Sequence, residues 1–187
     1  WAAGAVSEQQ APDFLEALFR RTHAALRAHA DAPGRTPGTT LVALYVDAQV
    51  AHWAHCGDSR LYQRENGRIV RRTRDHTPVQ EALEAGRIRE QDMATDPRQN
   101  QLLQALGVVE SPQVDHGSSP VATSTAFLLC SDGFWENVSP SEMAAVLAEP
   151  DLEQALAGQV DLAAERGGLQ ADNVTAAAWR RVPGDSG

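Results

Sequence analysis

Three aspartates lie where predicted strands meet their loops, and their side chains have the chemistry of a metal site. Asp58 stands in Cys-Gly-Asp-Ser-Arg, Asp132 in Cys-Ser-Asp-Gly after the most apolar predicted strand, and Asp172 in Ala-Asp-Asn-Val-Thr before the last strand. Gathered carboxylates repel one another unless a cation neutralises them. Mg²⁺ and Mn²⁺ prefer such oxygen ligands. Taken singly, each aspartate is better explained as a turn or cap residue. The motifs around the three aspartates are therefore needed to distinguish a metal site from ordinary turns.

His76, in Asp-His-Thr at 75–77, is the candidate acid that would protonate a leaving group, because histidine titrates near neutral pH. The alternative is a loop histidine that fixes the chain entering residues 77–104. A serine hydrolase that pairs Ser59 or Ser131 with His76 is a second alternative. It has little support, since the sequence contains no Gly-x-Ser-x-Gly elbow.

Composition excludes several classes of protein. The 187 residues include 16 arginines and no lysine, against 25 acidic residues, for a net charge of −9. Without lysine there is no Walker A loop, Schiff-base lysine or Ser-x-x-Lys nucleophile. The acidic balance argues against a nucleic-acid partner. No apolar run reaches about 18 residues and no signal peptide is visible, so we expect no membrane partner and a cytoplasmic location.

Hydrophobic spacing predicts a mixture of helices and strands. We expect helices at 12–30, 78–86, 90–95, 99–106, 139–147 and 152–166, and strands at 39–46, 49–56, 59–64, 68–72, 113–116, 123–130 and 173–182. Asn66 and Gly67 predict a tight hairpin, and the first four strands are expected to form one antiparallel meander. Ser139 and Glu142 form a predicted capping box with Pro140 between them. This order of elements favours an α+β sandwich over a doubly wound sheet.

Six short motifs occur in a fixed order along the chain. They are Gly-Thr-Thr at 38–40, Gly-Asp-Ser-Arg at 57–60, Arg-Asp-His-Thr at 74–77, Ala-Leu-Gly at 105–107, Leu-Leu-Cys-Ser-Asp-Gly at 128–133 and Asp-Asn-Val-Thr at 172–175. The ordered set resembles the metal-dependent serine/threonine protein phosphatases of the protein phosphatase 2C type, in their compact bacterial form. Residues 77–104 resemble the mobile flap of that family. The resemblance implies an antiparallel β-sandwich flanked by helices, in α-β-β-α layers, across residues 1–187.

The resemblance also implies a site and a reaction. Asp132 and Asp172 match catalytic carboxylates that hold two Mn²⁺ or Mg²⁺ ions, and Asp58 with Asp132 matches the ligands of a third, weaker ion. Gly133 and Asn173 are expected to support these carboxylates. The implied activity is the hydrolysis of phosphoserine or phosphothreonine in proteins by a metal-activated water. The implied substrate is a phosphorylated protein, and the opposing enzyme is a serine/threonine kinase.

The early part of the family pattern is absent from these residues. The family's early half supplies a phosphate-binding arginine, an acidic residue, and an Asp-Gly-x-Gly-Gly-His stretch whose aspartate bridges both ions. Residues 1–10 resemble the family's next segment, at the beginning of its first helix. We therefore expect further strands upstream of Trp1 in the parent protein, and we expect the 187 residues alone to be inactive. The alternative is a non-catalytic, phosphatase-like binding or regulatory module.

Overall fold

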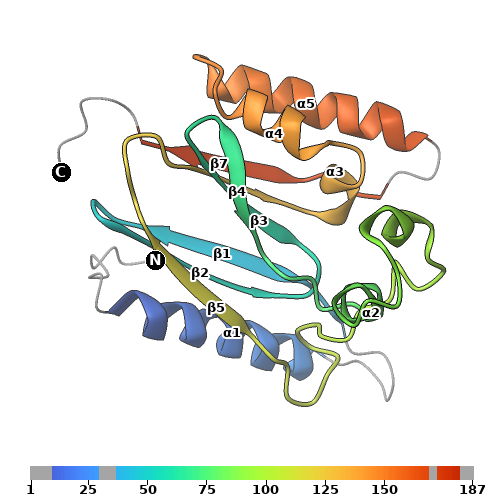
Figure 1. The fold of residues 1–187 in the computed structure, drawn as a ribbon. Helices are drawn as coiled ribbons and strands as arrows, with labels where there is room; N and C mark the ends of the chain where they lie inside the picture. Colours follow the sequence, from blue (N-terminus) through green and yellow to red (C-terminus); the bar gives the residue numbers. More distant parts are fainter. Residues whose placement is uncertain (1–9, 30–36, 169–171, 182–187) are drawn as a thin grey trace. The chain divides into compact units, whose positions relative to one another are not determined.

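Two units, each built on one antiparallel sheet, account for the described elements. The computed structural model describes residues 10–29, 37–168 and 172–181. The first unit takes residues 1–57 and 102–121, and the second takes residues 58–101 and 122–187. Each unit has at least one helix packed against its sheet (Figure 1). The predicted α+β class with antiparallel sheets is therefore confirmed.

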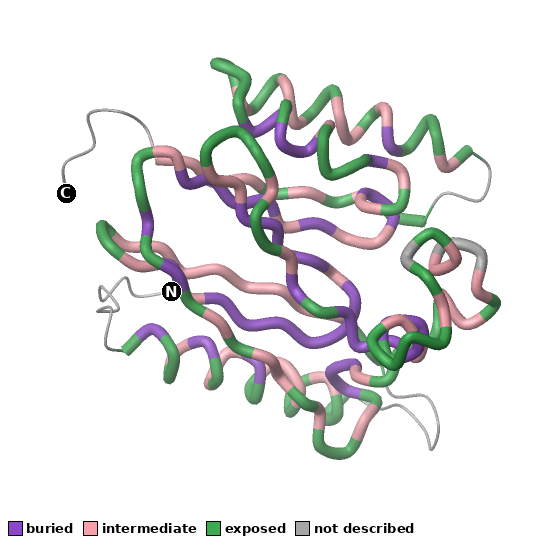
Figure 2. The backbone as a smooth tube through the Cα atoms, in the orientation of Figure 1, coloured by how far each residue is buried: buried purple, intermediate pink, exposed green. Residues whose placement is uncertain are grey.

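The first unit is a three-stranded sheet with one covering helix. Its strands, in the order β1-β2-β5, are Leu41–Val46, Val50–Cys56 and Asp115–Pro120. Helix α1 (Ala11–Ala28) buries Leu15 and Phe19 against Ala54 of β2. Figure 2 shows the buried positions of α1 recurring along one side, as the apolar spacing of its sequence requires.

The second unit is a four-stranded sheet in the order β4-β3-β6-β7. Its elements are β3 (Arg60–Glu65), β4 (Arg68–Arg72), α2 (Pro78–Glu84), the 3-10 helix η2 (Glu90–Thr95), β6 (Ala126–Cys130), α3 (Asp132–Trp135), α4 (Pro140–Val146), α5 (Leu152–Gly167) and β7 (Ala176–Arg180). Leu128 of β6 packs with Phe134, Met143, Leu147 and Ala163 in one buried cluster. That cluster holds α3, α4 and α5 against the sheet, so the loops at the sheet's ends have a rigid support.

Several local predictions are confirmed. The Asn66 and Gly67 turn, with φ of 48° and 86°, joins β3 to β4 as a hairpin. The Ser139 hydroxyl accepts from the backbone N–H of Glu142, while the Glu142 carboxylate accepts from the backbone N–H of Ser139. Pro140 is the first residue of α4. Each of these predictions depends on residues a few positions apart, so hydrogen bonds within one short segment are enough to form the predicted turn or cap.

The predicted four-stranded meander is wrong. Strand β2 pairs with β1 and β5, whereas β3 pairs with β4 and β6, so the chain changes sheets between Cys56 and Arg60. Gly57 makes this change possible, because its φ of +106° lies in the region that L side chains rarely adopt. A Cβ there would also lie 2.4 Å from Cγ2 of Thr40.

The predicted helix at 99–106 is also wrong. The backbone of Leu106 exchanges two hydrogen bonds with Thr39, at 2.9 and 3.1 Å, and the Gln104 side chain accepts from the N–H of Gln113. These long-range bonds replace the bonds that a helix would make. The strand predicted at 113–116 runs instead from 115 to 120, and the last strand begins at 176. Helix α3 was not predicted.

The single domain over residues 1–187 and the flap at 77–104 stay predictions. Residues 77–101 of that flap belong to the second unit, and 102–104 belong to the first. In the described ranges no helix has both the length and the apolar character needed to cross a bilayer.

Substituting Gly57 by alanine should destabilise the chain by about 1–3 kcal/mol, because the new Cβ meets Thr40 and the backbone is held at a strained φ. Gly158 is the matched control, since it lies inside α5 with open space around its Cα. Gly158→Ala should raise the free energy of unfolding by about 0.5–1 kcal/mol. Urea denaturation of both variants measures the difference, and an equal effect at the two positions would contradict this account of the turn.

Candidate metal centre

Ser131 ties together the two chain segments that carry Asp132 and Asp172. Its backbone N–H donates to the carbonyl of Thr175 at 3.0 Å, and its hydroxyl donates to the carbonyl of Asn173 at 2.9 Å. The N–H of Thr175 donates back to that hydroxyl at 3.1 Å. The residues after β6 and before β7 are thereby held side by side. Because these bonds occupy the Ser131 hydroxyl, the geometry gives no support to a nucleophilic role for it.

Gly133 allows the same two segments to approach closely. A Cβ at this position would lie 2.9 Å from the carbonyl oxygen of Asn173 and 3.0 Å from that of Asp172. The Gly133 N–H donates to the Asp132 carboxylate at 2.8 Å. Gly133 thus supports Asp132 directly and leaves room for the loop that carries Asp172, as the resemblance implied for a supporting residue.

Asn173 contacts Asp172 through its backbone, since the Asn173 N–H donates to the Asp172 carboxylate at 2.7 Å. Each of the two carboxylates therefore accepts from the N–H of the residue immediately after it. The hydrogen bond fixes one oxygen of each group and leaves the other oxygen available for a ligand.

The carboxylates of Asp132 and Asp172 line one pocket of about 270 Å³, together with Glu136. Glu136 was not predicted as a site residue. It comes directly after α3 and lies four positions after Asp132, and its N–H donates to the Asp132 carbonyl. Burial, followed by the negative charges of Asp132 and Asp172, raises the pKa of Glu136 above its ordinary value. The spacing of Asp132 and Glu136 was the available signal, since residues four apart share a helix face.

Asp58 is buried and electrostatically coupled to Asp132. Only 8% of Asp58 is exposed. Burial, and then the charges of Asp132 and Asp75, raise its pKa to about 6. The indole N–H of Trp135 donates to the Asp58 carbonyl at 3.0 Å, which fixes the backbone that presents the carboxylate. The charge of Asp132 therefore acts on Asp58, and the role of Asp58 as a metal ligand stays a prediction.

The donor set fits a hard divalent cation. In the part of the chain that the structure describes, no arginine forms an ion pair with Asp58, Asp132 or Asp172. Arg166 also lines the pocket, but its guanidinium pairs with Glu142. Burial and neighbouring negative charges raise the pKa of Asp58 and that of Glu136, as expected where carboxylates are gathered. Among the described residues, oxygens of the three aspartates do not all come within 4.8 Å of one another. Asp132, Asp172 and Glu136 line the pocket, whereas Asp58 does not.

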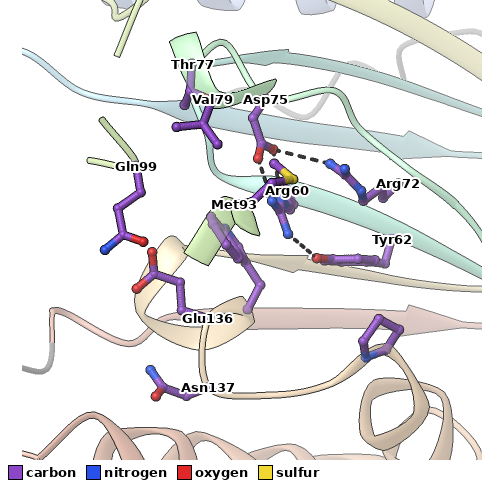
Figure 3. A pocket seen from close by; sticks show the side chains of 12 residues that line it. Arg60, Tyr62, Arg72, Asp75, Thr77, Val79, Met93, Gln99, Glu136 and Asn137 are labelled. Carbon is purple, nitrogen blue, oxygen red and sulfur yellow. Dashed lines mark hydrogen bonds and ion pairs between the residues drawn. The ribbon is translucent and has the colours of Figure 1, made fainter. Parts of the chain in front are cut away.

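A second pocket, of about 460 Å³, lies beside the first and shares Glu136 and Asn137 with it (Figure 3). Arg60 forms one of its walls. Its guanidinium donates to both carboxylate oxygens of Asp75, at 2.8 and 2.5 Å, and to the Tyr62 hydroxyl at 2.9 Å. Although burial disfavours the charged form, the Asp75 carboxylate outweighs it and raises the pKa of Arg60.

Arg60 also connects this wall to α3. Its guanidinium carbon lies 3.4 Å from the centre of the Trp135 ring, a cation–π contact. Trp135 in turn donates to the Asp58 carbonyl. Two side chains therefore link the buried Arg60–Asp75 ion pair to the backbone of a predicted metal ligand.

His76 is buried, with 2% of its surface exposed. It does not line either of these two pockets, whereas its neighbours Asp75 and Thr77 line the larger one. The structure therefore does not place His76 at the candidate metal centre, and its role as an acid stays a prediction.

The sequence model of the protein phosphatase 2C family matches residues 5–111 of the chain. This match covers more than half of the 187 residues. The chain belongs to the protein phosphatase 2C family, which confirms the resemblance predicted from the ordered motifs.

Named relatives agree with this assignment. The serine/threonine phosphatase Stp of Listeria welshimeri is 41% identical over 110 residues, or 59% of this chain and 44% of that protein. The structure of the S. agalactiae serine/threonine phosphatase matches with a TM-score of 0.83 and 25% identity, over 95% of this chain and 74% of that one. The catalytic domain of the phosphatase PstP, in complex with two manganese ions, matches with a TM-score of 0.68 and 26% identity, over 95% and 72%. The chain thus spans less than half the length of the Listeria relative.

The pKa of Asp58 predicts a pH-dependent stability in EDTA. The folded chain holds the Asp58 proton with a pKa of about 6, above the ordinary 3.8, so stability should fall as pH rises from about 4 to about 6. Asp58→Asn removes this penalty. The variant should be more stable than the wild type above pH 6, and the gap should close as the pH falls toward 4.

Urea denaturation across this pH range measures the effect. Asp161→Asn, on the exposed face of α5, controls for the loss of one negative charge. A stability gap for Asp58→Asn that does not change with pH would show that the Asp58 carboxylate does not titrate as described.

Proposed function

We propose that this chain forms part of a metal-dependent phosphatase that hydrolyses phosphoserine and phosphothreonine in proteins. The observation that carries the proposal is the pocket in which Asp132, Asp172 and Glu136 converge without an arginine paired to either aspartate in the described ranges. Membership of the protein phosphatase 2C family and the relatives named as serine/threonine phosphatases support the reaction class. The two manganese ions bound by PstP support Mn²⁺, with Mg²⁺ as the alternative ion of similar chemistry.

In this proposal the residues divide the work between binding and positioning. Asp132 and Asp172 would hold the cation, since each carboxylate has one oxygen that does not accept from the following backbone N–H. Asp58 adds a nearby negative charge, which strengthens the attraction for a divalent ion. Ser131 and Gly133 keep the two segments in register, so the carboxylates do not have to move together when the cation binds. A cation held there would supply an activated water and would neutralise charge on the phosphoryl oxygens.

A non-catalytic, phosphatase-like module is the alternative, and the phosphatase names of the relatives disfavour it. The phosphorylated protein, an opposing serine/threonine kinase, a third ion at Asp58 and a cytoplasmic location stay predictions from the sequence. So does the inactivity of the 187 residues alone.

Substituting Asp132 by asparagine should abolish Mn²⁺-dependent hydrolysis of p-nitrophenyl phosphate, because it removes a charged ligand without changing the shape of the side chain. The assay uses the parent chain as its complete reading frame encodes it, and the 187-residue chain is measured beside it. EDTA should remove the activity of the parent chain.

Asp161→Asn is the matched control and should retain activity, since Asp161 is exposed on α5. Full activity of the Asp132→Asn variant would contradict the assignment of the metal centre. Absence of activity in the parent chain with any divalent metal would favour the non-catalytic module instead.

A further inference from the structure

A cluster of arginines lies at the end of the second unit's sheet that is opposite to Asp132. Arg64 and Arg180, from strands β3 and β7, line a pocket of about 350 Å³ with Arg181, Thr123 and Ser124. Neither aspartate nor glutamate lines this pocket among the described residues. In a chain of net charge −9, a site that contains cations alone calls for a physical reason.

The pocket continues into a second one of about 480 Å³. The two share Arg64 and Ala148, and the second adds Arg68 and Ile69 beside helix α4. In the described ranges, no acidic side chain lines the second pocket either. We call the two together the arginine groove; four of the chain's sixteen arginines line it.

Arg64 has unused hydrogen-bonding capacity. Its Nε atom is buried and has no hydrogen-bond partner, and within the described part of the chain its guanidinium forms no ion pair. A buried donor without a partner is costly, and more so when it is charged. An anion bound in the groove would neutralise the charge of this guanidinium.

Arg180 is held in place by groups that do not neutralise it. Its two terminal nitrogens donate to the carbonyl oxygens of Glu149 and Pro150, where α4 leads toward α5. Carbonyl acceptors fix the guanidinium without a formal negative charge. Arg180 is therefore a preorganised cation, and preorganisation lowers the entropic cost of binding a ligand.

We propose that the arginine groove binds a phosphoryl group carried by a protein segment. Arginine forks match the paired oxygens of a phosphate, and a dianion suits a site that presents Arg64 and Arg180 without an acidic neighbour among the described lining residues. The hydroxyls of Thr123 and Ser124 are further donors in the same pocket. The apolar wall at Ile69 and Ala148 offers a surface for the peptide that carries the phosphate.

The groove is distinct from the candidate metal centre. Arg64 pairs with Ala126 at the beginning of β6, whereas Arg60 pairs with Cys130 at the end that leads to Asp132. The two pairs are four positions apart, about 13 Å along the strand. Binding in the groove needs no metal and no hydrolysis, so it goes beyond the proposed function.

Other anionic partners fit the groove less well. Nucleic acid requires a long basic face, and the acidic balance of the chain opposes it. A bilayer surface requires several cations around an exposed apolar face, whereas Arg64 and Arg180 line a pocket. Both partners become outcomes of the test.

The test is binding of a fluorescein-labelled phosphothreonine peptide to the 187-residue chain in EDTA, measured by fluorescence anisotropy beside the unphosphorylated peptide. The wild type should prefer the phosphorylated peptide, and the affinity should fall as salt rises. Arg64→Gln and Arg180→Gln should each weaken binding by about tenfold or more, the loss expected when hydrogen bonds to a charged group are removed.

Arg21→Gln, exposed on α1, is the matched control and should bind like the wild type. Asp132→Asn should also bind like the wild type, whatever its effect on hydrolysis, so failure of this proposal and failure of the proposed function are distinguishable. Circular dichroism checks that each variant is folded. If Arg64→Gln does not fold, Ser124→Ala, which removes a hydroxyl donor of the same pocket, should weaken binding instead.

Three results would overturn the proposal. The first is equal affinity for the phosphorylated and unphosphorylated peptides. The second is unchanged binding by a folded Arg64→Gln variant. The third is binding of duplex DNA or of phosphatidylserine vesicles through Arg64 while the phosphopeptide does not bind.

Discussion

The candidate site depends on holding like charges together before any cation is present. Burial, and then the negative charge of Asp132, raise the pKa of Asp58 and that of Glu136, and the charge of Asp172 adds to the effect at Glu136. Keeping these carboxylates charged therefore costs free energy in the folded chain. The hydrogen bonds of Ser131 oppose that repulsion by fastening the segment before β7 to the end of β6. Helices packed behind the sheet keep this end from fraying. These hydrogen bonds therefore stabilise the site against repulsion between its carboxylates, and the binding of a cation would reduce that repulsion.

Sequence patterns predicted the elements whose signals are local. The hairpin at Asn66 and the capping box at Ser139 arise from residues a few positions apart. The aspartates of the candidate metal centre were predicted in another way, since turn chemistry explains each one alone. Their ordered motifs identified the family, and the structure then placed Asp132 and Asp172 on one pocket. The structure also coupled Asp58 to Asp132.

The features that the sequence could not predict depend on long-range pairing. Strands β2 and β3 show the same alternation in one sheet or in two, so only the conformation at Gly57 separates them. Residues 99–106 have helical composition, yet the backbone of Leu106 bonds to Thr39, far away in sequence. Glu136 was missed although it lies four positions after Asp132, because its place in the site also depends on the loop carrying Asp172, 36 positions further along the chain. No sequence pattern identified Arg64 as a binding residue, because the arginines that line the groove with it come from other strands.

Trp135 has a consequence for how the molecule can be observed. Its indole N–H bonds to the backbone of Asp58, and its ring faces the cation of Arg60. Indole emission responds to nearby charge and to changes in hydrogen bonding. Ion binding at the neighbouring carboxylates should therefore alter the optical environment of this ring. The fold has placed a spectroscopic reporter between the buried ion pair and the acidic pocket, where titration with a divalent salt can be followed without an added dye.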